Sequence, residues 1–154
     1  LITVSRGVLK MTVQDKAEAM GIEFSPASPG YLAMCVQSGA VIMTSGHVSA
    51  MQGVLGHDLS VEQGYAAARE CAVSILQSVH QHHGSLDGLR VLKLLGCVYS
   101  ARDFVDQHRV VNGASDLFHE LFGPELGHHA RSALGFAALP TGVAVEIEAM
   151  FEVV

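Results

Sequence analysis

Charged residues are scarce in this sequence. Only 16% of the 154 residues are Asp, Glu, Lys or Arg, and the nine Lys and Arg residues are scattered rather than clustered. Binding to a phosphate backbone depends on basic patches, so the net charge of −6 argues against a nucleic-acid partner. With 49% hydrophobic residues, a small monomer has few polar residues with which to cover its outer surface. This favours association between copies of the chain, with a large core as the alternative.

Paired cysteines and long apolar runs are also missing. The odd set of Cys35, Cys71 and Cys97 is widely spaced within apolar segments, which predicts buried free thiols in a reducing compartment rather than a disulfide framework. No run approaches the roughly 20 apolar residues of a membrane span, and no charged segment with a cleavage site opens the chain. We therefore expect a cytoplasmic protein with no membrane partner.

The length predicts one domain. The sequence begins with Leu1, and the stretch from Met11 is typical of a natural start followed by a short helix over 14–20. We expect residues 1–24 to be an N-terminal extension with that helix, and 25–154 to be the domain. An N-terminal edge strand is the alternative for residues 1–10.

The clearest element is a helix over 60–83. Ser60 and Gln63 have the spacing of a capping box, and Gly84 is a C-terminal stop. One face carries the apolar side chains, at Tyr65, Ala68, Ala72, Ile75, Leu76 and Val79. We expect this face to pack on a sheet.

The rest of the sequence predicts strands and one further long helix. Two apolar runs within 31–46, split at Gln37-Ser38-Gly39, predict a hairpin. The near-continuous run over 89–100 predicts a strand buried on both faces, and the next helix ends at Gly123-Pro124. Two last strands, about 130–138 and onward to Val154, are expected to form a second hairpin around Pro140 to Gly142. The order β-β-α-β-α-β-β predicts an α+β fold, a mixed sheet with two main helices on one face.

Two kinds of site have little support. His80, His82, His83, His128 and His129 lack the spacings of a zinc site, so we expect no metal and interpret the first three as solvated residues at a helix C-terminus. Cys71 and Cys97 fall on apolar faces, which is typical of core residues rather than nucleophiles.

Three charges near the C-terminus have two interpretations. Alternation over 145–153 puts Glu146 and Glu148 on the polar face of a strand, where they are either solvated or functional. Arg131 opens the preceding strand and is either a partner in a structural ion pair or part of a site. Composition and periodicity leave the choice open.

Three motifs resemble the Rid family (reactive intermediate deaminase, also called YjgF-like or L-PSP endoribonuclease). "ARSALGFAALPTGVAVEIEA" is similar to its terminal signature, "PGYLAMCVQSGAVIMTSG" to its tyrosine and first hairpin, and "VVNGASDLF" to its helix-opening asparagine. The resemblance covers about 29–154. It implies a chorismate-mutase-like fold and a homotrimer with clefts between subunits. It also implies cofactor-independent hydrolysis of enamines or imines to 2-keto acids and ammonia.

The resemblance also implies roles for single residues. Arg131 matches the arginine that binds the substrate carboxylate, which suits a planar, permanently charged guanidinium. Glu146 matches the residue that positions water and moves protons. The substrate-binding positions are Tyr31, Ser45, Gly46, Asn112, Arg131, Ser132 and Ala133.

Several departures indicate a divergent subgroup. Ala133 stands where the family often has cysteine, and His47 replaces a glutamine at what we expect to be the edge of the pocket. Extra residues lie around "DQHR" before Asn112. The alternatives to a deaminase are a non-catalytic module that binds a small carboxylate or a partner protein, and, with less support from the acidic charge, a ribonuclease.

Overall fold

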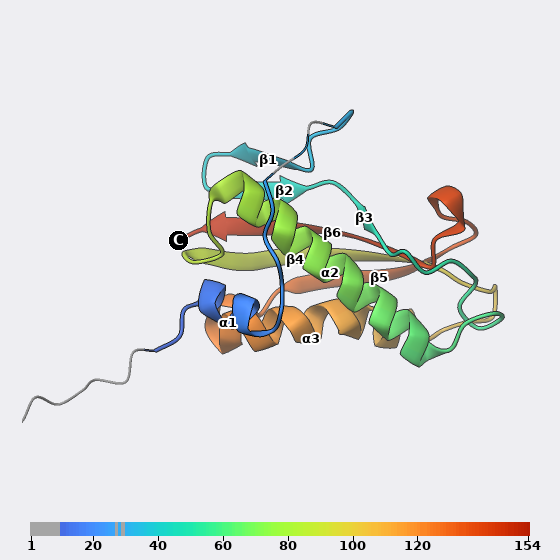
Figure 1. Ribbon diagram of the computed structural model, residues 1–154. Helices are drawn as coiled ribbons and strands as arrows, with labels where there is room; N and C mark the ends of the chain where they lie inside the picture. Colours follow the sequence, from blue (N-terminus) through green and yellow to red (C-terminus); the bar gives the residue numbers. More distant parts are fainter. Residues whose placement is uncertain (1–9, 27, 29) are drawn as a thin grey trace, which may run out of the picture.

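The computed structural model describes residues 10–26, 28 and 30–154 (Figure 1). The expectations for residues 1–9 lie outside this part of the chain. In the part of the chain that the structure describes, three α-helices and a six-stranded sheet follow one another in a mixed order that confirms the predicted α+β class. The strands are β1 (Cys35–Ser38), β2 (Val41–Thr44), β3 (His47–Val48), β4 (Leu89–Tyr99), β5 (Ala130–Phe136) and β6 (Val145–Val153).

The strand order corrects the predicted C-terminal hairpin. The sheet runs β1-β2-β6-β4-β5, with β3 also paired to β6, so β4 lies between the last two strands. The helix between β4 and β5 carries the chain back, and β5 therefore joins β4 in parallel. β6 then pairs antiparallel with the other edge of β4. The turn at Pro140–Gly142 is a short 3-10 helix that connects strands which are not neighbours.

The two main helices, α2 (Val61–His83) and α3 (Gln107–Leu126), cover one face of the sheet (Figure 1). The capping box of Ser60 and Gln63 and the left-handed Gly84 bound α2 as predicted. The predicted apolar face is buried except at Tyr65, which is half-exposed and donates a hydrogen bond to Asp116 on α3 (2.9 Å).

A glycine allows the two helices to approach closely. A Cβ on Gly113 of α3 would overlap the backbone carbonyl oxygen of Tyr65 on α2. Backbone atoms of two packed helices cannot move apart locally, so the position excludes larger residues. The expected end of α3 is also present, since Gly123 leaves the helical region (φ 74°) before one further turn to Leu126.

The N-terminal helix α1 (Val13–Ala19) joins the same core. Thr12 and Asp15 form its capping box, and the Lys16 ammonium donates to the Leu121 carbonyl at the end of α3 (3.4 Å). Ala17 and Ile22 are buried members of the hydrophobic core. The short helix therefore covers part of α3.

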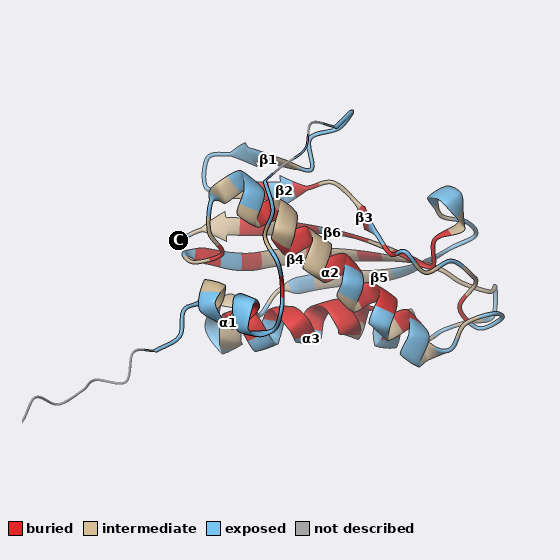
Figure 2. Ribbon diagram, viewed as in Figure 1, coloured by how far each residue is buried: buried red, intermediate tan, exposed pale blue. Residues whose placement is uncertain are grey.

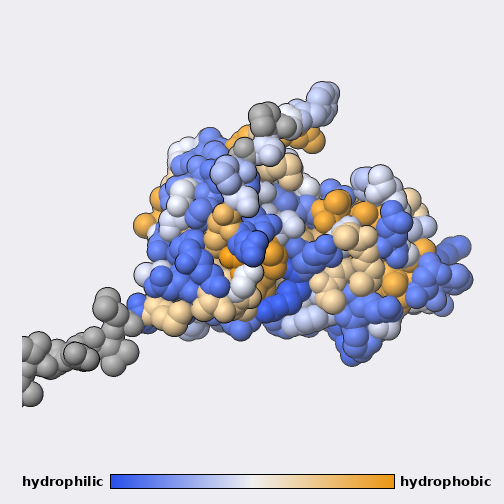
Figure 3. All heavy atoms as spheres, viewed as in Figure 1, coloured by the Kyte–Doolittle hydropathy of each residue, from blue (hydrophilic) through white to orange (hydrophobic). Residues whose placement is uncertain are grey.

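The second face of the sheet is open. Burial alternates along β4, where Leu94 and Val98 face the helices and are buried, while Leu95 and Cys97 face the other way and are half-buried. Figure 2 shows buried residues along α2 and α3, on the covered side of the sheet. The prediction of a strand buried on both faces is therefore wrong for the single chain. Exposed apolar side chains on strands of this sheet are Val36, Met43, Val48, Leu134 and Phe136. Figure 3 views the molecule from the helix side, which is largely hydrophilic with apolar patches.

Candidate functional site: an arginine cavity and a glutamate on opposite faces

Arg131 lies at the helix side of the sheet edge. It pairs in register with Leu94, whose side chain is buried beneath the helices, so Arg131 extends toward α3. Its Nη1 donates to Asn112 Oδ1 (2.8 Å) and to Ser115 Oγ (3.0 Å), two acceptors that stand three residues apart and hence on one face of α3. The half-buried guanidinium is thus held by neutral groups.

A cavity of about 300 Å³ opens beside this guanidinium. Its lining residues are Asn112, Ser115, Asp116, His119, His129 and Arg131. Within the described part of the chain, Arg131 makes no salt bridge, and the Asp116 carboxylate accepts from the Tyr65 hydroxyl instead. The cavity therefore offers an oriented positive charge to a small anion.

Asn112 is not at the opening of its helix. α3 begins at Gln107, so the residues of "DQHR" after Asp106 form its first turn and Asn112 lies in the second. This placement corrects the interpretation of Asn112 as a helix-opening residue. It leaves Asn112 within hydrogen-bonding distance of Arg131.

Four lining residues of this cavity, Ser115, Asp116, His119 and His129, were not predicted as site residues from the sequence. Ser115 is buried and its Oγ lies 3.0 Å from His129 Nε2, while His129 Nδ1 lies 2.6 Å from the Gly127 carbonyl oxygen. Burial lowers the pKa of His129, and the charges of His119 and Arg131 lower it further, against the hydrogen bond to Gly127. The spacing of Asn112 and Ser115 on one helix was the available signal.

Glu146 lies on the other face of the sheet. It is opposite Cys97 on β4 and Val48 on β3, and its neighbours Val145 and Ile147 are buried on the helix side. The predicted alternation along β6 is therefore confirmed, with Glu148 exposed. Within one chain, Arg131 and Glu146 do not share a cavity, because side chains alternate between faces and the two residues have opposite phase in the register.

Gly46 is brought next to Glu146. A Cβ on Gly46 would overlap the Glu146 carboxylate, so the side chain of Glu146 packs directly over the glycine backbone. Ser45 is bound to the preceding loop: its Oγ donates to the Ala33 carbonyl (2.8 Å), and its backbone N–H donates to the Met34 carbonyl (2.9 Å). Gly46 and Glu146 thus form one local group, and Ser45 ties the adjacent backbone to the loop before β1.

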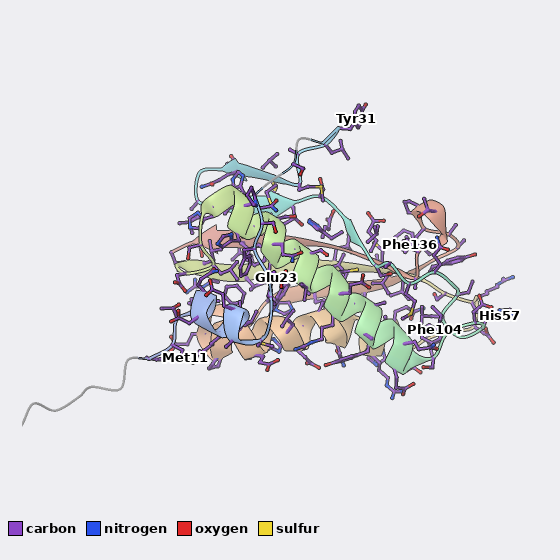
Figure 4. All side chains as sticks on the ribbon, in the orientation of Figure 1. Met11, Glu23, Tyr31, His57, Phe104 and Phe136 are labelled. Carbon is purple, nitrogen blue, oxygen red and sulfur yellow. The ribbon has the colours of Figure 1, made fainter. Side chains whose placement is uncertain are left out.

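Tyr31 does not join either group. Its side chain is fully exposed, and Figure 4 shows it at the tip of the loop before β1, pointing away from the sheet. Ser132 and Ala133 also separate from each other: Ser132 Oγ accepts from the Lys93 ammonium (2.9 Å), whereas Ala133 packs against the core. Arg131 and Asn112 are therefore the pair of predicted site residues that share one cavity.

His47 departs from the expectation of a pocket-edge residue. Its ring is buried, with Nδ1 2.8 Å from the Ser45 carbonyl and Nε2 2.8 Å from Ser78 Oγ on α2. Burial lowers the pKa of His47, with the Ser45 hydrogen bond acting in the opposite direction. Since β3 pairs His47 with Ile147 on the helix side, the ring fills space under α2.

The histidines and cysteines lie in varied surroundings, from the buried His47 and Cys71 to the exposed His57 and His128. In the described ranges, no group of three or more His, Cys, Asp or Glu side chains is placed to hold a metal ion. Burial raises the pKa of Cys71 to about 12 and that of Cys35 to about 11. Cys71 is fully buried, whereas Cys35 and Cys97 are only half-buried, in part against the prediction.

Comparison with known proteins assigns this fold to a family. A family model described as "YjgF/chorismate mutase-like, putative endoribonuclease" matches residues 14–148. The chain belongs to the YjgF/chorismate mutase-like family. The structure of Atu1372 from Agrobacterium tumefaciens, a protein of unknown function, is 36% identical with a TM-score of 0.81, over 93% of this chain and 94% of that one.

Two further proteins are similar to this chain. A Shewanella oneidensis MR-1 protein described as a "putative endoribonuclease" is 27% identical with a TM-score of 0.84, over 92% of this chain and 99% of that one. Protein TCP17 of Trypanosoma cruzi is 48% identical over 103 residues, which make up 66% of this chain and 64% of that protein. The matched region thus spans less than two thirds of the trypanosome protein. No helix in the described residues has the length and apolarity needed to span a membrane.

Proposed function

We propose that this YjgF-like protein hydrolyses reactive enamines or imines that carry a carboxylate, of the 2-aminoacrylate type. An enamine first tautomerises to the imine, with a proton added at carbon and one lost from nitrogen. Water then adds to the C=N carbon, and collapse of the adduct releases ammonia and a 2-keto acid, so no cofactor is consumed. The observation that carries this proposal is the Arg131 guanidinium, which opens to a small cavity, is held by two neutral acceptors and makes no salt bridge in the described part of the chain.

The proposed roles divide between two groups. Arg131 binds the carboxylate, and Asn112 holds the guanidinium from α3. Glu146 positions the attacking water and moves protons between the water and the leaving nitrogen. Ser45 and Gly46 shape the surroundings of Glu146, since the carboxylate packs over Gly46.

This chemistry requires more than one chain. Arg131 and Glu146 lie on opposite faces of the same sheet, whereas a small imine must contact both. A homotrimer solves this when the β5 edge of one subunit lies beside the Gly46 and Glu146 group of the next. The exposed apolar side chains of the open face support such an interface.

Mixing of inactive variants tests this arrangement. Arg131→Ala and Glu146→Gln are each expected to abolish pyruvate release from freshly generated 2-aminoacrylate. Co-refolding equal amounts should restore about one quarter of the wild-type rate, because one cleft in four then combines an intact arginine with an intact glutamate from its neighbour. No recovery on mixing would contradict the shared site, and a wild-type rate equal to that in buffer across a panel of carboxylated imines would contradict the activity.

The cavity also supports a second candidate function. A non-catalytic module that binds a small carboxylate needs Arg131 and its cavity but not Glu146, and the separation of the two residues within a chain favours that reading. Pyruvate binding followed by calorimetry in the Glu146→Gln variant separates the candidates. A binder keeps its full function in this variant, whereas the deaminase keeps binding and loses turnover. An endoribonuclease has less support, given the net charge of −6.

A further inference from the structure

A chain of hydrogen bonds in the Arg131 cavity starts at a backbone carbonyl at the C-terminal end of α3. The Gly127 carbonyl oxygen lies 2.6 Å from His129 Nδ1, His129 Nε2 lies 3.0 Å from Ser115 Oγ, and Ser115 Oγ lies 3.0 Å from Arg131 Nη1. Gly127 is the C-cap of α3 and its backbone N–H is bonded to Gly123. The chain therefore connects a fixed backbone atom to the guanidinium.

The direction of each bond follows from the groups involved. A carbonyl oxygen only accepts, so His129 Nδ1 carries the proton. In the neutral ring Nε2 is then an acceptor, and the Ser115 hydroxyl donates to it. The oxygen of Ser115 keeps its lone pairs for Arg131 Nη1, which only donates. The lowered pKa of His129 agrees with a neutral ring.

The chain fixes which donors of Arg131 remain available. Nη1 is occupied by Asn112 and Ser115, which leaves the Nε and Nη2 edge of the planar group. That edge presents two parallel N–H bonds, the geometry that grips a carboxylate through both oxygens. A free arginine side chain loses rotamer freedom when it binds a ligand. Because the guanidinium of Arg131 is already held by its hydrogen bonds, less entropy is lost, and this favours binding.

We propose that His129 is a positioning residue for Arg131 and acts through Ser115. The anionic ligand of Arg131 rests on the proposed function, whereas the hydrogen-bonded chain does not. Ser115 is a buried hydroxyl whose two partners are this imidazole and this guanidinium. His129 satisfies the backbone at the end of α3 with one nitrogen and orients Ser115 with the other.

Two substitutions of His129 separate its two hydrogen bonds. In His129→Gln the amide oxygen stands in for Nε2 and keeps an acceptor for Ser115. In His129→Asn the shorter amide keeps a donor for Gly127 but provides no acceptor at the position of Nε2. We expect His129→Asn and Ser115→Ala to raise KM about tenfold with kcat changed less than twofold, the effect of one lost hydrogen bond. His129→Gln should stay within twofold of wild type in both constants.

A spectroscopic measurement tests the chain independently of turnover. In ¹⁵N NMR spectra of the full-length protein, we expect the His129 ring to be protonated at Nδ1 at neutral pH, and the Arg131 Nη signals to be resolved through slow rotation of the guanidinium. Ser115→Ala should merge these signals and His129→Gln should not. A proton at His129 Nε2, or Arg131 signals unchanged in Ser115→Ala, would overturn the inference. An inactive wild-type protein that still has these NMR signatures would refute the proposed deaminase alone.

Discussion

The carboxylate of Glu146 lies directly over the backbone of Gly46, in the space that a Cβ at this position would occupy. The glycine and the glutamate are 100 positions apart in sequence, and they meet because β3 pairs antiparallel with β6 through Val48 and Glu146. The backbone of Gly46 lies outside the left-handed region, so alanine is compatible with its conformation. A substitution at Gly46 can therefore displace the Glu146 carboxylate while Glu146 itself stays unchanged.

Gly46→Ala should remove activity while leaving the fold intact. The added methyl group overlaps only the end of a flexible side chain, so the Glu146 carboxylate rotates away at little cost to the free energy of unfolding. If Glu146 handles the protons of the reaction, kcat falls by about 100-fold, the contribution of a general acid–base group. Thermal unfolding and turnover are measured on the same sample, and unchanged kcat with unchanged Tm would refute the role of Glu146.

Gly113→Ala should destabilise the protein. The methyl group overlaps the Tyr65 carbonyl oxygen in the backbone of α2, so the two helices must separate. We expect the free energy of unfolding to fall by about 1–3 kcal/mol in spite of the better helix propensity of alanine. Urea denaturation at neutral pH measures the change.

Gly64→Ala is the matched control for this contact. Gly64 lies in α2, and its added methyl group approaches only side-chain atoms, with the nearest being Leu55 Cδ1 at 2.7 Å. Side chains adjust more readily than backbone, so Gly64→Ala should cost clearly less than Gly113→Ala. An equal loss in the two variants would show that the backbone approach of α2 and α3 is not the decisive contact.

Stability should decline as the pH falls below about 6.5. The pKa of His47 is lowered from its ordinary value of 6.5 by burial, so the folded state binds fewer protons than the unfolded state below that pH. The slope is at most about 1.4 kcal/mol per pH unit for one histidine, and the loss levels off once the pH passes the pKa of the folded state. His129 adds a contribution of the same sign.

His47→Gln isolates the contribution of one ring. Glutamine does not titrate, so urea unfolding at pH 7.5, 6.5 and 5.5 should give a shallower decline than in the wild type. Identical slopes in the two proteins would contradict a neutral, buried His47.

The thiols should react slowly in the folded protein. Burial raises the pKa of Cys71 and Cys35, and for Cys97 burial is joined by the negative charges of Glu146 and Glu148. The thiolate is the reactive form, so at pH 8 a thiol-specific disulfide reagent should label all three at least about tenfold more slowly than in urea. Rapid labelling of Cys97 would contradict its assignment as a structural residue beside Glu146.

Local sequence patterns predicted most of the secondary structure correctly. The capping box at Ser60 and Gln63, the stop at Gly84 and the alternation around Glu146 depend on spacings within a few residues, and each is present in the structure. The two-residue strand β3 was missed because it is too short for periodicity to register. The predicted hairpin of the last two strands was wrong because β4 separates them, and adjacency in sequence carries no information on such an insertion.

The sequence by itself determined the α+β class, since the order of the elements follows from local periodicity. It also determined the family motifs, and the choice of Arg131 and Glu146 came from the resemblance of these short motifs to the family, not from composition or period. Only the tertiary structure decided that the two residues face opposite sides of one sheet, because the phase of each strand is set by its pairing with β4. It also decided that Ser115 and His129 meet beside Arg131. Their contact depends on α3 lying across the start of β5, a long-range packing that no spacing along the chain encodes.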